Sequence, residues 1–432
     1  MGLNSMKRQV DMREVIESQE AEKQSLLSTP YIEREQAAEA VKLLDSDLVK
    51  VITGPRRAGK SVFALMLLRD RDFAYVNFDD ERLLGIEDYD KMVQAIFQVH
   101  PKAKYLLFDE IQNLKHWELL VNRLHRRGLN LVITGSNARL LSSELSTALT
   151  GRHIPIELLP FSVREYLRAK GISTADLGSA LPEVKGKGMG ELESYLIMGG
   201  YPEVVTKSLD ARSYLTVLFE STLFKDVVRR YNLRYSAKIA ELSAYLSTDF
   251  PIEFTFTKLK NSLDFNSVAT VQNYVSYLEE SYVFFVLNRF SHKIKEQLKA
   301  SRKVYLVDNG FAARVNSPNS GKLLENVVFG DLLRRGYHPN DSIFTYRTKT
   351  NREVDFLLRK NRKNEELVQV TYRLDEKTEE RELRSLCEAG EELNCNNLQV
   401  VTWDQEGEVK TGEKYVKYLP FWKWALRPLE QG

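Results

Sequence analysis

Cysteine is almost absent from this sequence, and so are long apolar runs. Only two cysteines, Cys387 and Cys395, occur in 432 residues, which excludes a disulfide framework and a cysteine-based zinc site. No apolar stretch approaches the ~20 residues that a transmembrane helix needs. Residues 1–24 are polar and charged and lack the apolar core of a signal peptide. We therefore expect a cytoplasmic protein.

An excess of charge of one sign is also missing. The chain has 62 Lys and Arg residues against 60 Asp and Glu residues, a formal net charge of +2. A surface that binds nucleic acid would therefore have to be local. Hydrophobic residues make up 43% of the chain and charged residues 28%, which is typical of a soluble globular protein. A chain of this length is expected to form about three domains.

One stretch carries the strongest chemical signal. Apolar runs at residues 48–53 and 62–68 flank it, which predicts a strand, a turn and a helix. In that context the pattern G-x-x-x-x-G-K-[ST] predicts a phosphate-binding loop. The residues expected to hold the nucleotide are Gly54, Pro55, Arg56, Arg57, Ala58, Gly59, Lys60, Ser61 and Val62.

The positions of this loop have separate physical roles. Gly54 and Gly59 let backbone N–H groups approach the phosphates without an intervening side chain, and the following helix adds the partial positive charge of its N-terminus. Lys60 is expected to reach the β- and γ-phosphates of ATP, and Ser61 to hold Mg²⁺. The sequence therefore predicts a nucleoside triphosphate site that works with magnesium.

Two carboxylates follow a later apolar run. Residues 105–108 lead into Asp109 and Glu110, a pattern typical of a buried parallel strand with acidic residues at its C-terminal end. Ligands bind at that end in open α/β sheets. We expect Asp109 to orient Mg²⁺ and Glu110 to polarise the attacking water.

A further strand, at residues 131–134, ends in polar residues. Asn137, with Ser136 or Thr134 as alternatives, is placed to hydrogen-bond the γ-phosphate or the attacking water. The same residues would also serve as caps for a helix expected at residues 138–149.

An arginine opens the next strand-like segment. Arg152 is a candidate finger that neutralises charge in the transition state, either in its own chain or in a neighbouring subunit. An ordinary salt bridge is the alternative interpretation. Arg56, Arg57 and Arg139 are further candidates for the same role.

The middle of the chain is mostly helical in pattern. Residues 161–246 alternate helical periodicity with glycine-containing turns, and we expect them to pack as a lid beside the nucleotide. The pattern then changes to helix, turn, helix and β-ribbon, which predicts a winged helix. Its segments are residues 257–263, 264–266, 267–280, 282–287 and 303–307.

This predicted winged helix carries polar and basic residues. The second helix is expected to lie in or near the major groove of DNA, and the basic residues of the ribbon to follow the phosphates. The helix candidates are Ser267, Thr270, Gln272 and Asn273; the ribbon candidates are Lys293 and Lys295, accompanied by Arg289, His292, Lys299, Arg302 and Lys303. The alternative is a protein-binding module whose lysines are simply solvated.

The last part of the chain has acidic residues in a suggestive order. A helix at residues 323–329 carries Glu325, and the second of three strand-like segments carries Asp355; the segments are residues 342–346, 353–358 and 366–372. This order resembles that of a restriction-endonuclease-like fold, in which Asp and then Asp/Glu-x-Lys bind metal and activate water. Here Gln369 replaces the second carboxylate and Thr371 the lysine. We therefore expect a degenerate domain used for binding or assembly, with an active nuclease as the alternative.

These motifs together resemble a family of bacterial and archaeal AAA-plus ATPases. The similarity includes residues 54–61, 107–112, 134–141, 151–152 and 157–166, and it extends from Tyr31 to about Trp403. In that family an ATPase is followed by a winged helix and a restriction-endonuclease-like domain. The expected fold is thus α/β, with a P-loop parallel sheet followed by a helical lid, a winged helix and an α/β endonuclease-like domain.

The resemblance also implies an organisation and a function. We expect a helical N-terminal arm at residues 1–30, solvated or, alternatively, in contact with another subunit. An ATPase core at 31–160, a lid at 161–246, a winged helix at 247–310 and an endonuclease-like domain at 311–432 are expected to follow. The implied protein is a Mg²⁺-dependent ATPase that binds and remodels or translocates DNA as a homo-oligomer, such as a hexameric ring. The alternatives are a nucleotide-controlled switch that binds a protein partner, in signalling or defence, and an ATP-dependent DNA nuclease.

Overall fold

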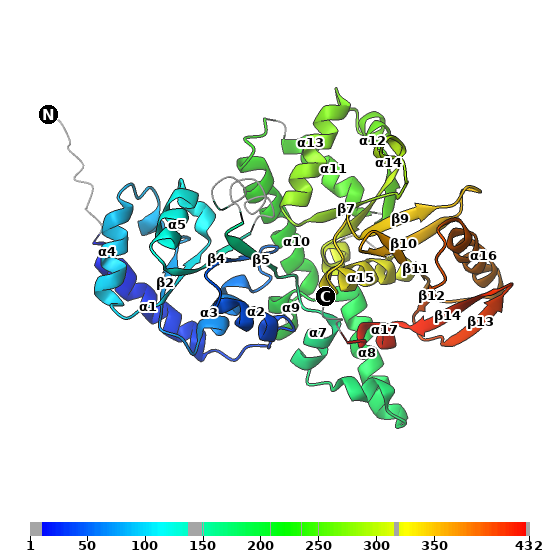
Figure 1. Cartoon of the computed structure of the whole chain (residues 1–432), viewed down its shortest axis with the longest axis horizontal. Helices are drawn as coiled ribbons and strands as arrows, with labels where there is room; N and C mark the ends of the chain where they lie inside the picture. Colours follow the sequence, from blue (N-terminus) through cyan, green and yellow to red (C-terminus); the bar gives the residue numbers. More distant parts are fainter. Residues whose placement is uncertain are drawn as a thin grey trace. The chain divides into compact units, whose positions relative to one another are not determined.

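The computed structural model describes residues 11–136, 149, 151–207, 209–234, 236–248, 250–314 and 319–428. The chain divides into two compact units, Met1–Leu158 and Leu159–Gly432. Figure 1 shows the helices and strands of each unit. No helix among the described residues combines the length and the apolar character needed to cross a lipid bilayer.

The first unit is built on a parallel sheet of five strands. The strands are β1 (Val49–Thr53), β2 (Phe73–Asn77), β3 (Tyr105–Asp109), β4 (Asn130–Gly135) and β5 (His153–Glu157). Their order is β2-β3-β4-β1-β5, and every neighbouring pair is parallel. Because β4 lies between β1 and β3, the ends of these three strands come side by side. The predicted α/β fold with a parallel P-loop sheet is confirmed.

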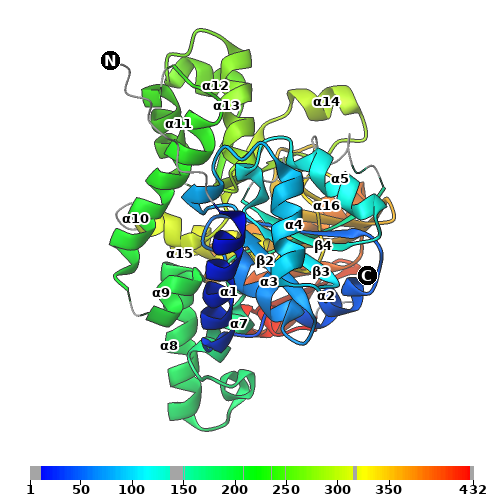
Figure 2. The same cartoon turned by 90° about the vertical axis from the view of Figure 1, so that its left-hand side faces the viewer.

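Helices cover both faces of this sheet. α1 (Met12–Ser28), α4 (Tyr89–Val99) and α5 (Trp117–Arg126) share one apolar cluster with alternate residues of the strands. α2 (Ala37–Leu44) and α3 (Lys60–Leu68) share a second cluster with the intervening strand residues. Figure 2 shows α1 and α4 side by side against the sheet. Since both faces are buried, the strands are almost continuously apolar.

Helix α1 corrects the expectation of a solvated N-terminal arm. Val15 and Ile16 are fully buried in the first apolar cluster. Gln19 donates from Nε2 to the backbone oxygen of Asn77 at 3.0 Å and accepts from its backbone N–H at 3.0 Å. Lys23 Nζ donates to the backbone oxygen of Phe73 at 3.2 Å. β2 is an edge strand with unpaired backbone groups, and these side chains satisfy some of them.

The second unit begins with a series of helices, as the periodicity predicted. They are α7 (Val163–Ala169), the short 3₁₀ helix η4 (Thr174–Gly178), α8 (Pro182–Met198), α9 (Pro202–Lys207), α10 (Ala211–Thr222), the π-helical segment η5 (Leu223–Arg229) and α11 (Ser236–Thr248). Their role as a lid over a nucleotide stays a prediction.

A helix pair and a small antiparallel sheet follow. The helices are α12 (Phe256–Ser262) and α13 (Val268–Glu280), and the strands β6 (Ile252–Phe254), β7 (Phe284–Asn288) and β8 (Arg302–Leu306) pair in the order β6-β8-β7. The short helix α14 (Ile294–Lys299) connects β7 to β8. The predicted helices and strands are present; their identity as a DNA-binding winged helix stays a prediction.

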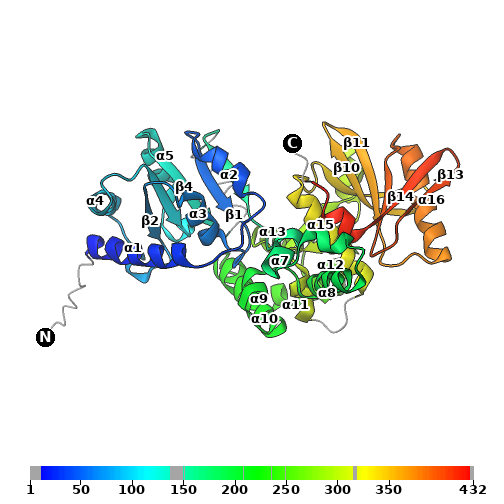
Figure 3. The same ribbon diagram turned by 90° about the horizontal axis from the view of Figure 1, so that it is seen from below.

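The chain ends in a second α/β layer. Six strands pair in the order β13-β14-β12-β11-β10-β9, and Figure 3 shows this sheet with its helices. The strands are β9 (Ile343–Arg347), β10 (Glu353–Lys360), β11 (Lys363–Val370), β12 (Leu398–Thr402), β13 (Gly407–Thr411) and β14 (Lys414–Pro420); the helices are η6 (Asn309–Arg314), α15 (Ser320–Arg334), α16 (Glu376–Glu392) and α17 (Phe421–Ala425). The three strands predicted around Asp355 correspond to β9, β10 and β11.

Candidate nucleotide site

The loop between β1 and α3 requires glycine at two positions. Gly54 has a φ of 142°, and a Cβ there would lie 2.0 Å from the backbone oxygen of Leu158. Gly59 has a φ of 92° and precedes the first residue of α3. Larger residues are strained in this left-handed region. The two glycines therefore fix the shape of the loop and place the N-terminus of α3 beside it.

Lys60 is the first residue of α3 and is buried. Its Nζ donates to the backbone oxygens of Gly54, at 3.1 Å, and of Pro55, at 2.9 Å. The ammonium group thus turns back over the loop that its helix follows. Phosphate oxygens bound in this loop would compete with these carbonyl oxygens for the same ammonium.

Asp109, at the end of β3, is buried and held by hydroxyl groups. Its Oδ1 accepts from Ser61 Oγ at 3.0 Å and from Thr134 Oγ1, and its Oδ2 accepts from Tyr75 Oη at 3.2 Å. Burial raises the pKa of Asp109 to about 6, and the neighbouring Glu110 contributes, while the bonds from Thr134 and Ser61 oppose the shift. The predicted pair of Ser61 and Asp109 is in direct contact.

Glu110 follows Asp109 in an unusual backbone conformation. Its φ is 50°, a left-handed value that costs about 1–3 kcal/mol in a residue other than glycine. Its N–H donates to Thr134 Oγ1 at 3.0 Å, and its Oε2 accepts from Gln112 Nε2. Thr134 therefore ties the end of β4 to both acidic residues, and the strained turn fixes the direction in which the Glu110 side chain leaves the strand.

The other predicted nucleotide-site residues are distributed around this centre. Ser136 Oγ accepts from Gln112 Nε2 at 3.5 Å, beside Glu110. Asn137 and Arg139 lie outside the described residues. The remaining loop positions differ in exposure: Pro55 and Ala58 are buried, Arg56 and Val62 are partly buried, and Arg57 is exposed with a φ of 63°.

Arg152 lies at the amino ends of the strands, whereas the phosphate loop follows the carboxyl end of β1. β5 pairs in parallel with β1, from Val49 opposite His153 to Thr53 opposite Glu157. Arg152 precedes β5, so about 16 Å of strand separates it from the end where the loop begins, more than its side chain spans. Its Nη1 is 3.5 Å from Asn122 Oδ1. The proposal of a finger within the same chain is therefore wrong, and a role in a neighbouring subunit stays a prediction.

Three residues of this site were missed in the sequence. Arg34 donates from Nη1 to the backbone oxygen of Ala58 at 2.9 Å and so supports the loop from outside. Tyr75 and Gln112 hold Asp109 and Glu110. The sequence offers only a weak signal for Tyr75 and Gln112, which is their polarity. Tyr75 interrupts an apolar strand, and Gln112 follows the acidic pair by two positions.

The candidate DNA-binding residues fall into two groups. Ser267 caps α13, and its Oγ accepts from the backbone N–H of Thr270 at 3.1 Å, so both residues have a structural role. Gln272 and Asn273 are exposed on the same helix, and Lys293 and Lys295 are exposed at α14.

Lys303 contradicts its assignment to the basic surface. It lies in β8, is 7% exposed, and its Nζ pairs with Glu325, Glu353 and Asp355. Burial alone would lower the pKa of Lys303, but Asp355 and Glu325 raise it well above its ordinary value. A charge held inside the protein in this way cannot contact a DNA phosphate. The predicted pair of Glu325 and Asp355 does come together, around this lysine.

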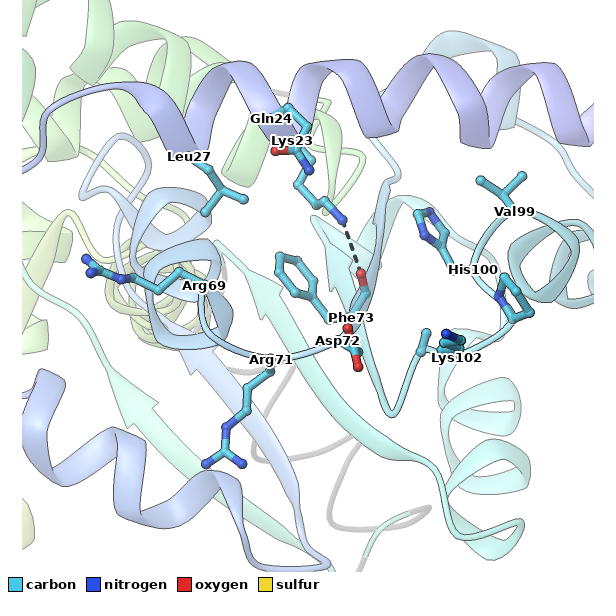
Figure 4. Close-up of a pocket in the computed structure, with 12 residues that line it drawn as sticks. Lys23, Gln24, Leu27, Arg69, Arg71, Asp72, Phe73, Val99, His100 and Lys102 are labelled. Carbon is cyan, nitrogen blue, oxygen red and sulfur yellow. Dashed lines mark hydrogen bonds between the residues drawn. The ribbon is translucent and has the colours of Figure 1, made fainter.

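A separate hollow lies at the amino ends of the strands of the first sheet, opposite to the end that carries the phosphate loop. It is lined by residues of α1, by the start of β2 and by the segment before β3, including Lys23, Arg71, Phe73, His100 and Lys102. Figure 4 shows Lys23 reaching the backbone oxygen of Phe73 across it. Because these residues are at the amino ends of the strands, the hollow is distinct from the phosphate loop.

Comparison with known families agrees with the geometry at the loop. The family described as AAA domain matches residues 46–167. Two families described as domains of unknown function, DUF8612 and DUF4143, match residues 189–321 and 320–424.

Relatives match nearly the whole chain. The uncharacterized protein MJ1544 of Methanocaldococcus jannaschii is 32% identical, over 94% of this chain and 96% of its own length. An uncharacterized protein of Haemophilus influenzae is also 32% identical, over 82% of this chain and 90% of its own. The chain belongs to this family of AAA-domain proteins. At the level of the family it is an ATPase of the AAA type.

Among solved structures, a Walker-type ATPase of Pyrococcus abyssi is similar over 67% of this chain and 99% of its own, with 15% identity and a TM-score of 0.43.

Proposed function

We propose that this AAA-type ATPase hydrolyses ATP with Mg²⁺ and couples hydrolysis to the binding and remodelling or translocation of DNA. The observation that carries the catalytic part is the contact between Ser61 and Asp109, 3.0 Å apart, with Glu110 beside them. These groups belong to α3 and to the end of β3, on the edge of the sheet where the phosphate loop begins. Parallel α/β sheets bind their ligands at this edge.

The chain's own residues fit a magnesium nucleotide. A hydroxyl and a carboxylate are hard oxygen ligands of the kind that Mg²⁺ prefers, and Ser61 and Asp109 would hold it. When bound, the ion neutralises charge on the phosphates and orients them. Thr134 and Tyr75 keep the Asp109 carboxylate in place without adding net charge.

The remaining roles follow from charge and position. Lys60 supplies a positive charge inside the loop, where the β- and γ-phosphates would lie. Glu110 acts as the group that polarises the attacking water, and its hydrogen bond from Gln112 orients the carboxylate. Thr134, bonded to both acidic residues, keeps the metal-binding and water-polarising groups in a fixed relation.

Exposed side chains of the second unit support the DNA part of the proposal. Gln272 and Asn273 face solvent from α13, and such amides can read base edges. Lys293 is exposed at the start of α14, where Glu296 is its partner at 3.0 Å, and Lys295 is exposed in the first turn of the same helix. Exposed lysines of this kind bind phosphates through charge.

The proposal includes a homo-oligomer, and Arg152 provides a way to test it. It is exposed, and it lies at the sheet edge away from its own loop. If it serves catalysis, it must therefore reach the nucleotide of a neighbouring subunit, as in a ring. Native mass measured with ATP, and turnover of mixtures of Arg152→Ala and Glu110→Gln chains, test this arrangement. Recovery of activity in the mixture is the expected result, because each chain supplies what the other lacks. A monomer with full turnover would overturn it.

The central experiment measures phosphate release with and without duplex or branched DNA. The wild type is expected to hydrolyse ATP faster when DNA is added, and Lys60→Ala is expected to reduce release to background. Lys42→Ala, which removes an exposed lysine of α2, is the matched control and should behave as the wild type. Equal release by the wild type and Lys60→Ala would refute the catalytic assignment.

The same experiment separates the proposal from a nucleotide-controlled switch that binds a protein. Turnover that no DNA affects, together with slow release of bound nucleotide, would refute the DNA coupling and favour the switch. Incubation of supercoiled plasmid with Mg²⁺ or Mn²⁺ tests for a nuclease. We expect the plasmid to stay intact; cleavage that Asp355→Ala abolishes would contradict that expectation.

A further inference from the structure

A lysine of β8, Lys303, lies beside the C-terminal sheet where the endonuclease resemblance implies a metal ion. Glu325 of α15 and Asp355 of β10 are the two carboxylates that such a metal would need. In this structure, however, the space between the carboxylates is occupied by the ammonium group of Lys303. The residues present therefore do not fit the implied ion, and their contacts show why.

Three carboxylates converge on one ammonium group. Lys303 Nζ lies 2.7 Å from Glu325 Oε1, 2.8 Å from Glu353 Oε1 and 3.0 Å from Asp355 Oδ1. The ammonium donates hydrogen bonds to Glu353 and Asp355 and forms an ion pair with Glu325. The positive charge of Lys303 is thus at the point that the carboxylates share.

The carboxylates of the cluster accept other hydrogen bonds as well. Asp355 Oδ2 accepts from the backbone N–H of Val370 at 3.0 Å, and Glu325 Oε1 also accepts from Tyr305 Oη at 2.8 Å. Gln369 Oε1 accepts from the backbone N–H of Asp355 at 3.1 Å. The side chain at the position of the missing carboxylate therefore holds the backbone of β10 and does not face an ion.

We propose that Lys303 is the resident cation of this site and that its ammonium replaces a divalent metal. A metal that entered would have to displace an ammonium bonded to three carboxylates and leave it buried without partners, which is strongly unfavourable. Because Lys303 of β8 supplies the positive charge, the cluster can form without a lysine at position 371 and without a carboxylate at position 369. The same contacts fix β8 to α15 and β10. The inference concerns this cluster alone, so its failure would leave the ATPase proposal untouched.

A Mn²⁺ titration of the full chain without nucleotide tests the proposal. Free Mn²⁺ is followed by electron paramagnetic resonance for the wild type, Asp355→Asn, Lys303→Ala and the double variant of both. The wild type and Asp355→Asn should bind equally little Mn²⁺. Lys303→Ala should gain one site per chain, because the carboxylates lose their internal cation, and the double variant should lose that site again.

Two results would overturn the proposal. One is a stoichiometric Mn²⁺ site in the wild type that Asp355→Asn removes. The other is a folded Lys303→Ala chain that binds no more Mn²⁺ than the wild type. Lys299→Ala, in the neighbouring helix α14, controls for the loss of one positive charge and should bind as the wild type does.

The test remains decisive if Lys303→Ala does not fold by itself. Refolding is then carried out with and without MnCl₂, and recovery of folded chain only with Mn²⁺ supports the proposal. If the variant folds under neither condition, the wild type is compared with Asp355→Asn. We expect neither chain to bind Mn²⁺ at this site; binding by the wild type that Asp355→Asn removes would overturn the proposal.

Discussion

Two buried aspartates, one in each unit, have opposite kinds of partner. Asp109 is 2% exposed and Asp355 is 5% exposed, so burial does not distinguish them. Asp109 accepts hydrogen bonds from the hydroxyls of Ser61, Thr134 and Tyr75. Asp355 accepts from the ammonium of Lys303 and from a backbone N–H.

The difference in partners decides what each site can do. A hydroxyl stabilises a carboxylate without cancelling its charge, so Asp109 can still serve a metal ion and a nucleotide. An ammonium group supplies a positive charge and occupies the space beside the carboxylate, so Asp355 is closed to a second cation. The same residue type at similar depth therefore makes a binding site in one unit and an internal ion cluster in the other.

The largest expected effect is on catalysis at the first site. Glu110→Gln keeps the shape of the side chain but removes its negative charge, so ATP hydrolysis should fall by about 10²–10⁴-fold, while ATP binding is retained. Single-turnover phosphate release and a fluorescent nucleotide titration measure the two quantities. Glu87→Gln, an exposed position in the same unit, should change neither. Unchanged turnover in Glu110→Gln would show that another group activates the water.

The next effect is on the stability of the second site. Lys303→Met keeps the length of the side chain and removes its charge, which leaves the buried Glu325 and Asp355, and the partly buried Glu353, without their common partner. The free energy of unfolding should fall by about 3–5 kcal/mol, measured by denaturant unfolding of the full chain. Lys299→Met should change it by less than about 0.5 kcal/mol. Equal stability of the two variants would mean that the cluster tolerates the loss of its cation.

Another carboxylate, the partly buried Glu279, sharpens the comparison because its bond is to a backbone N–H and not to a hydroxyl or an ammonium group. Its Oε1 accepts from the backbone N–H of Val286 at 3.1 Å. Burial raises the pKa of Glu279 to about 7, against the bond from Val286 and the charge of Arg302, which oppose the shift. Since the folded-state pKa is the higher one, its stability contribution is present below about pH 4.5 and is lost as the pH rises through about 7.

Glu279→Gln should therefore stabilise the chain at pH 8, by about 1–3 kcal/mol, and should flatten the stability profile between about pH 4.5 and 7. Thermal unfolding at a series of pH values measures both effects. A variant that is less stable than the wild type at pH 8 would show that the ionised carboxylate is favourable in the folded state.

The smallest expected effect concerns the exposed lysines of α14. Lys293→Ala and Lys295→Ala should each weaken DNA binding uniformly across sequences and reduce the slope of log affinity against log salt by about 1. Fluorescence anisotropy at several salt concentrations measures this slope. The Lys303→Ala chain, provided it folds, should keep the wild-type slope, because that lysine is internal. A loss of slope in Lys303→Ala alone would place the DNA surface elsewhere.

The phosphate site was predictable because its signals are contiguous. Gly54, Lys60 and Ser61 stand in one short pattern between two apolar runs, and Asp109 ends another apolar run. Such patterns specify strand, turn and helix locally. The position of Arg152 at the amino ends of the strands was not predictable, because it follows from the register of β5 on β1, which no local pattern contains.

The internal cation and the buried first helix were not predictable for a related reason. Lys303 meets Glu325 and Asp355 across 22 and 52 residues of sequence, and a run of neighbouring basic residues made it resemble a DNA-binding lysine. In α1, the buried face continues from Val15 and Ile16 into Gln19 and Lys23. Polar residues on a buried face weaken the helical periodicity from which burial is inferred.

The most direct test of the contrast between the two aspartates is Mn²⁺ binding by the full chain in the presence of a non-hydrolysable ATP analogue. We predict one Mn²⁺ per chain, bound with the nucleotide, which Asp109→Asn weakens or removes and Asp355→Asn leaves unchanged. Loss of the bound Mn²⁺ in Asp355→Asn, with retention in Asp109→Asn, would contradict the account.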